Sequence, residues 1–112
     1  MAYPWTIKDP LNEIIIVQKE EQLLQGYPAT EDGHATYIRD FIKLIKRTPN
    51  NKCIGFHYWE PCWIPFKEDW SVGHLNNWSN LTLFDYEGRS LMGLAVIREF
   101  NDPSQKGASL IE

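Results

Sequence analysis

The chain has 112 residues, of which 43% are hydrophobic and 23% charged, with a formal net charge of −4. These values are typical of one small soluble domain over residues 1–112. The interspersed charges argue against a nucleic-acid-binding protein, which needs a basic surface. No apolar run approaches the ~20 residues of a membrane span, and the N-terminus lacks the regions of a signal peptide.

The first elements along the chain are short. Pro4, Pro10 and Asn12 predict a loop over residues 1–12. The β-branched run Ile14–Val17 favours a short strand. The polar residues that follow, up to about residue 26, predict a turn of helix or a loop.

Residues 30–47 predict a helix. Thr30 is a suitable N-cap, and Glu31 and Asp32 place negative charge at the positive end of the helix dipole. An apolar stripe follows i, i+3, i+4 spacing. It consists of Ala35, Ile38, Phe41, Ile42 and Ile45.

Residues 52–59 predict a strand with two largely uncharged faces, which is typical of a strand covered on both sides in a parallel sheet. A helix, a short loop and such a strand form half of a βαβ unit, which indicates an α/β fold. One face carries Ile54, Phe56 and Tyr58, and the other carries Cys53, Gly55, His57 and Trp59.

The rest of the chain predicts less regular structure. Residues 60–80 form a long connection, residues 81–86 favour a short strand, and residues 87–89 form a turn. Residues 90–99 fit either a helix or the second arm of a hairpin. Residues 101–112 predict a flexible tail.

The tryptophans and cysteines are the residues that bear on binding surfaces, disulfides and metal sites. Four of the five tryptophans fall between residues 59 and 78, in a loop-rich segment where aromatic rings tend to line a surface. If residues 53–59 form a strand, Cys53 and Cys62 lie too far apart to form a disulfide unless the chain turns back sharply. Cys53 and His57 would be separated by roughly 13 Å on a strand, too far to share an ion. We therefore expect neither a metal site nor a cofactor.

Five motifs occur in order along the chain. They are AYPWT (2–6), GYPATEDGHATYIRDFIK (26–43), GFHYWEPCWIP (55–65), NNWSNLTLFDYEGRSL (76–91) and GLAVI (93–97). This series resembles the C-terminal part of glycoside hydrolase family 53, the endo-β-1,4-galactanases that act on arabinogalactan. The likeness extends from residue 2 to about residue 97.

The resemblance implies a partial (β/α)8 TIM barrel. By the match, the chain would supply the end of strand seven, helix seven, strand eight, loop eight and the start of helix eight. An isolated piece of this kind would lack the neighbours of strand eight. We therefore expect either self-association or a rearrangement in which Ile14–Val17 and residues 81–86 replace those neighbours.

The resemblance also implies candidate substrate-binding residues. Related barrels carry a tryptophan at the end of strand eight as the floor of a sugar subsite, and Trp59 matches this position. Its ring would lie against the C–H face of a galactose unit, while a carboxylate would bind its hydroxyls. The candidate residues are Trp59, Glu60, Trp78, Trp5 and Asn80.

The same resemblance provides no catalytic residue. Two glutamates, ending strands four and seven, perform hydrolysis in this family. The strand-seven nucleophile precedes the AYP motif, which here follows only Met1, and the strand-four acid has no counterpart. We expect the chain alone to be inactive. Some bacterial members bind calcium through a run of oxygen ligands; Asp9 and Asn12 are present here but the fuller run is not, so we expect no ion.

Three functions remain open. The chain can be part of a galactanase that binds galactan-type oligosaccharides or polysaccharides together with the missing barrel portion. It can instead be a small carbohydrate-binding module. It can also be a self-associating interaction or structural protein, for example a homo-oligomer, with a vestigial sugar site. The family is usually secreted, yet this sequence shows no signal peptide, so the compartment stays open.

Overall fold

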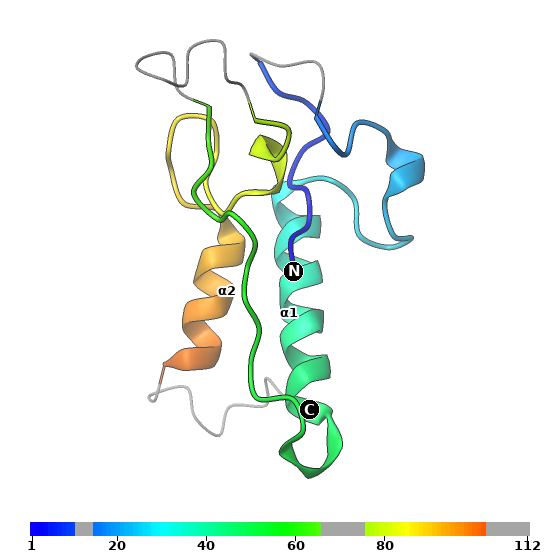
Figure 1. Ribbon diagram of the computed structural model, residues 1–112, viewed down its shortest axis with the longest axis vertical. Helices are drawn as coiled ribbons and strands as arrows, with labels where there is room; N and C mark the ends of the chain where they lie inside the picture. Colours follow the sequence, from blue (N-terminus) through cyan, green and yellow to red (C-terminus); the bar gives the residue numbers. More distant parts are fainter. Residues whose placement is uncertain (11–14, 66–75, 103–112) are drawn as a thin grey trace.

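The computed structural model describes residues 1–10, 15–65 and 76–102. Two α-helices, α1 (Glu31–Arg47) and α2 (Met92–Asn101), lie side by side and run in the same direction (Figure 1). In the described ranges, three short 3-10 helices accompany them, η1 (Glu20–Gln22), η2 (Pro49–Asn51) and η4 (Ser79–Leu81). No helix in these ranges has the length and apolar character needed to cross a bilayer.

The prediction of a helix over residues 30–47 is confirmed. The Thr30 hydroxyl accepts a hydrogen bond from the Gly33 amide at 3.0 Å and so caps the first turn of α1. The stripe of small and branched apolar side chains faces the interior, and Ile38 is fully buried. The helix ends at Arg47, and the C-cap residue Thr48 adopts an extended conformation before Pro49.

Residues 90–99, which fit two elements in the sequence, contribute to both. Ser90 pairs with Phe84 in an isolated antiparallel bridge, and α2 begins two residues later. The intervening turn closes at Gly88, which has a φ of +81° and donates its amide to the Asp85 carbonyl at 3.0 Å. The core between the two helices is formed by Ala35, Ile38, Ile42, Leu83 and Val96.

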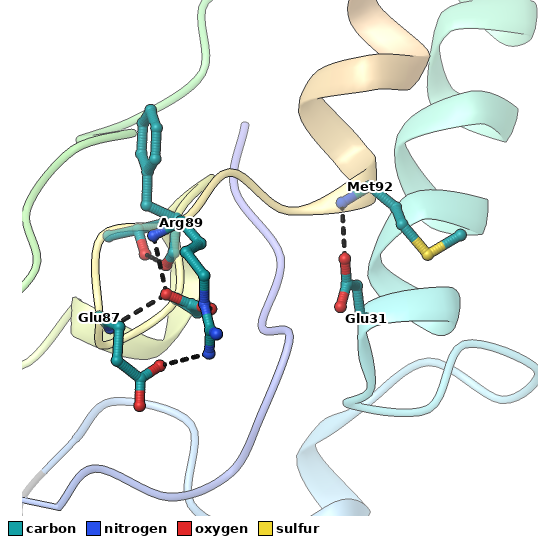
Figure 2. A network of polar contacts seen from close by, with 7 residues as sticks. Glu31, Glu87, Arg89 and Met92 are labelled. Carbon is teal, nitrogen blue, oxygen red and sulfur yellow. Dashed lines mark hydrogen bonds and ion pairs between the residues drawn. The ribbon is translucent and has the colours of Figure 1, made fainter.

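A carboxylate of α1 caps the start of α2. Leu91, the N-cap residue of α2, provides no side-chain cap. Instead, the Met92 amide donates to the Glu31 carboxylate at 2.9 Å (Figure 2). This bond satisfies one of the free N–H groups at the helix N-terminus and joins the first turns of both helices.

We expect Glu31→Ala to lower the free energy of unfolding by about 1 kcal/mol, the usual cost of losing a helix cap. Urea denaturation followed by circular dichroism measures this loss. Asp32→Ala is the matched control, because it removes an acid from the same turn of α1 that has no bond to α2. Equal losses in the two variants would show that the general helix dipole, and not the cap, accounts for the effect.

The predicted strand over residues 52–59 is wrong in two respects. These residues run as an extended segment along the helices (Figure 1), but the described part of the chain contains no assigned strand. Only one face of the segment is covered, since Phe56 and Tyr58 are half-buried while Gly55 and His57 are exposed. Ile54 is 95% exposed. The predicted alternation therefore holds for residues 55–58 but not for Ile54, and the cover on the second face is absent there.

The physical reason is that a strand needs a partner for its backbone groups. The two expected substitutes do not provide one. The Ile16 amide donates to the Asn77 carbonyl, and the Leu83 amide donates to the Pro61 carbonyl, beyond the end of the segment. Ile14 lies outside the described residues. A partial barrel sheet, the predicted fold class, is therefore not seen in the described ranges.

Candidate functional site

Trp59 and Glu60 end the extended segment. Trp59 is anchored through its backbone, because its amide donates to the Met1 carbonyl at 2.7 Å. Its side chain is 55% exposed and meets Trp78, with ring centroids 6.4 Å apart and planes 63° apart. Two large rings from segments 19 residues apart thus form an edge-to-face pair, the Trp59–Trp78 pair.

Glu60 lies at a sharp change in chain direction. Its φ of +48° is in the left-handed region, which a residue other than glycine seldom occupies. The turn is held by the Trp63 amide, which donates to the Glu60 carbonyl at 3.4 Å, and by the bond from Leu83 to Pro61 at 2.8 Å. Glu60 is exposed to solvent and directly follows Trp59 in the chain.

Trp78 is fixed by a local polar frame. Its amide donates to the Asn76 side-chain oxygen at 2.9 Å, and the Asn76 amide group donates to the Trp63 carbonyl at 3.1 Å. It also forms the N-cap position of η4. Trp70 and His74, which belong to the same tryptophan-rich segment, lie outside the described residues.

Asn80 lies inside the molecule. It is fully buried, and its amide nitrogen donates to the Thr6 carbonyl at 2.8 Å and to the Val17 carbonyl at 2.9 Å. Its side-chain oxygen has no partner in the described chain. In this position Asn80 joins two loops, and the predicted contact with substrate stays a prediction.

Trp5 lines a different hollow. Its ring packs against Tyr86 with centroids 5.0 Å apart, and its backbone amide donates to the Asn80 carbonyl at 2.9 Å. Its indole nitrogen is buried and has no partner among the described residues. The groove beside it measures about 800 Å³, and neither Trp59 nor Trp78 lines it. The predicted residues therefore separate into an exposed group and a supporting group.

A polar cluster that the sequence did not indicate supports the loops. The Ser79 hydroxyl donates to the Asp9 carboxylate. The Tyr86 hydroxyl donates to the Lys8 carbonyl at 2.6 Å, and burial raises the pKa of Tyr86 to about 12. Within the described ranges no three His, Cys, Asp or Glu side chains gather into a metal-binding group, and Asn12 lies outside those ranges.

A second unforeseen feature is a hydrogen-bonded hub at Tyr58. Its hydroxyl donates to the Leu81 carbonyl at 2.5 Å and lies 2.8 Å from Nε2 of His34. Because the phenol proton goes to Leu81, Nε2 of His34 is the donor in their contact. The hub holds the extended segment against α1 and η4, directly before Trp59. Only the buried position of a histidine on the apolar side of α1 could have indicated it.

Comparisons with known proteins agree in pointing to one family. Residues 1–97 match the profile of glycosyl hydrolase family 53. An uncharacterized protein in the bgaB 5′ region of Niallia circulans is 46% identical over 97 residues, which cover 87% of this chain and 26% of that protein. The endo-beta-1,4-galactanase of Bacillus subtilis (strain 168) is 34% identical over 64 residues, covering 57% of this chain and 14% of the galactanase.

A solved structure from the same family is also similar to this chain. The Ignisphaera aggregans GH53 catalytic domain superposes with a TM-score of 0.74 at 36% sequence identity, covering 87% of this chain and 28% of that domain. The chain thus spans about a quarter of the length of these proteins, or less.

Proposed function

Because the chain belongs to glycosyl hydrolase family 53, we propose that it carries part of a galactan-binding site and does not cleave galactan by itself. The substrate class is inferred from the galactanase of Bacillus subtilis. The observation that supports the proposal most directly is the exposed Trp59 ring beside Trp78.

The geometry suits a sugar better than a generic apolar ligand. The C–H face of a galactose unit stacks on a flat aromatic ring, and its hydroxyls need polar partners at the edge of that ring. Trp59 supplies an exposed ring that meets Trp78, and the next residue, Glu60, is exposed and can supply the carboxylate. Trp5 and Asn80 would act by positioning the loops beneath.

Hydrolysis requires more than this surface supplies. A retaining glycosidase needs two carboxyl groups about 5–5.5 Å apart, and an inverting one needs them about 6.5–9.5 Å apart. Among the predicted substrate-binding residues, Glu60 is the one that carries a carboxylate. The glutamates that the family resemblance assigns to catalysis have no matching residue in this sequence.

We expect Trp59→Ala to weaken binding of β-1,4-galacto-oligosaccharides at least about tenfold, because a stacking ring contributes on the order of 1.4 kcal/mol. Isothermal titration of the purified chain measures this change. Trp63→Ala is the control, since Trp63 lies in the same loop and is not part of the Trp59–Trp78 pair. Circular dichroism verifies that both variants keep their helices.

Two results would contradict the proposal. Equal affinity of the wild type and Trp59→Ala for the oligosaccharides would show that Trp59 is not part of a binding surface. Release of reducing ends from β-1,4-galactan by the purified wild-type chain would refute its inactivity, and the same assay on Glu60→Gln would identify whether that carboxylate is responsible.

A further inference from the structure

The Trp59–Trp78 pair is assembled from two separate segments of the chain. Trp59 ends the extended segment, and Trp78 precedes η4 as its N-cap residue. The two rings meet with centroids 6.4 Å apart. An exposed ring binds a sugar well only while it is held in one orientation, because ordering it on binding costs affinity. The bonds that join the two segments therefore bear on binding.

Hydrogen bonds join these segments on both sides of Trp59. Before it, the Tyr58 hydroxyl donates to the carbonyl of Leu81, the last residue of η4, at 2.5 Å. After it, the Leu83 amide donates to the Pro61 carbonyl at 2.8 Å. The second bond lies between backbone groups. The first depends on a single side-chain atom, the phenol oxygen of Tyr58.

The surroundings of this oxygen direct its proton toward η4. The Leu81 carbonyl is 2.5 Å away, whereas the Tyr3 carbonyl is 3.3 Å away. Nε2 of the fully buried His34 lies 2.8 Å from the same oxygen and donates to it. Burial raises the pKa of Tyr58, so the hydroxyl keeps the proton that it donates to Leu81.

We infer that Tyr58 is a positioning residue of the proposed galactan-binding site, whose hydroxyl holds the extended segment against η4 and so keeps the Trp59 and Trp78 rings together. The ring of Tyr58 packs against the core between the helices, so the residue acts on the sugar through Trp59. The inference rests on the proposed function, but the contact between the two indole rings can be measured without a sugar.

Tyr58→Phe removes the hydroxyl and keeps the aromatic ring. We expect the affinity for β-1,4-galacto-oligosaccharides to fall about fivefold, as it would if the pair were formed in about a fifth of the molecules. The loss should be smaller than that of Trp59→Ala, because the stacking ring remains. Nuclear Overhauser contacts between the two indole rings should weaken in the same variant.

Tyr27→Phe is the matched control. It also removes a tyrosine hydroxyl, but that hydroxyl donates to Asp40 and to neither segment that carries a ring of the pair. We expect the affinity to change less than about twofold and the contacts between the indole rings to persist.

A double-mutant cycle separates positioning from general stabilisation. In the Trp59→Ala background, Tyr58→Phe should change the affinity less than about twofold, because the ring through which the hydroxyl acts is gone. A residue that only stabilised the fold would lower the affinity by the same factor in both backgrounds. Circular dichroism verifies that all variants keep α1 and α2.

Different results contradict the inference and the proposed function. Unchanged contacts between the indole rings in Tyr58→Phe would overturn the inference, as would equal losses of affinity in both backgrounds. A wild type that binds no galacto-oligosaccharide would refute the proposed function, while the ring contacts would still show whether Tyr58 positions the pair. If Tyr58→Phe lost its helices, the wild type would decide, since a Tyr58 hydroxyl proton that exchanges as fast as a phenol in water would overturn the inference.

Discussion

Gly33→Ala is expected to lower the free energy of unfolding by about 3 kcal/mol, the range found for overpacked sites. In an ordinary helix this exchange would stabilise by about 1 kcal/mol. Here a Cβ atom at Gly33 would lie 2.0 Å from the Pro28 carbonyl oxygen and 2.9 Å from its carbonyl carbon. Backbone atoms cannot rotate away as a side chain can. The clash therefore outweighs the helix preference of alanine, and the variant is less stable than the wild type. Urea denaturation of the variant measures it.

Gly55→Ala provides the matched control. A Cβ atom there would meet nothing within 4 Å, and we expect a change in unfolding free energy below about 0.5 kcal/mol, as at most exposed positions. Similar values for the two variants would mean that the loop before α1 moves freely, and that Pro28 does not fix the start of the helix.

Stability is expected to fall by about 3 kcal/mol as the pH is lowered from about 6.5 to about 4. Burial lowers the pKa of His34 from 6.5 to about 4, so the unfolded chain binds a proton in this range while the folded chain does not. Stability is fully present above pH 6.5 and decreases through this window. The cause is that a protonated ring would carry a second N–H group at Nδ1, where no partner exists among the described residues.

His34→Gln isolates this contribution. A glutamine can keep a donor near the Tyr58 hydroxyl, but it does not titrate. Denaturation midpoints measured at intervals from pH 7 to pH 4 should show a smaller decline for the variant than for the wild type. A decline of equal size would assign the acid sensitivity to other groups.

The sequence predicted those elements whose causes are local. The cap at Thr30, the apolar stripe and the stop before Pro49 all act within one helix, and α1 formed as expected. The alternation over residues 53–59 is also local, and Phe56 and Tyr58 do face the helices. Whether such a segment becomes a strand depends on a partner that alternation cannot reveal, so the sheet was not found where it was predicted.

The candidate site was predictable only where its residues lie close together in the sequence. Tryptophans close in sequence indicated a surface, and Trp59 and Trp78 do meet. That Trp5 and Asn80 lie beneath the loops follows from contacts with residues 17 and 86 that no local pattern encodes. The link between Ser79 and Asp9, which spans 70 residues, could not be foreseen from either side chain.

The Tyr58 hydroxyl has a consequence for the order in which the molecule folds. It joins residues separated from it by 55, 24 and 23 positions, namely Tyr3, His34 and Leu81. Each of these contacts closes a long loop of chain, whereas α1 forms from contacts three and four residues apart. The helix is therefore available early on the folding pathway, and the arrangement that presents Trp59 is completed only after three distant parts of the polypeptide have converged on one oxygen atom.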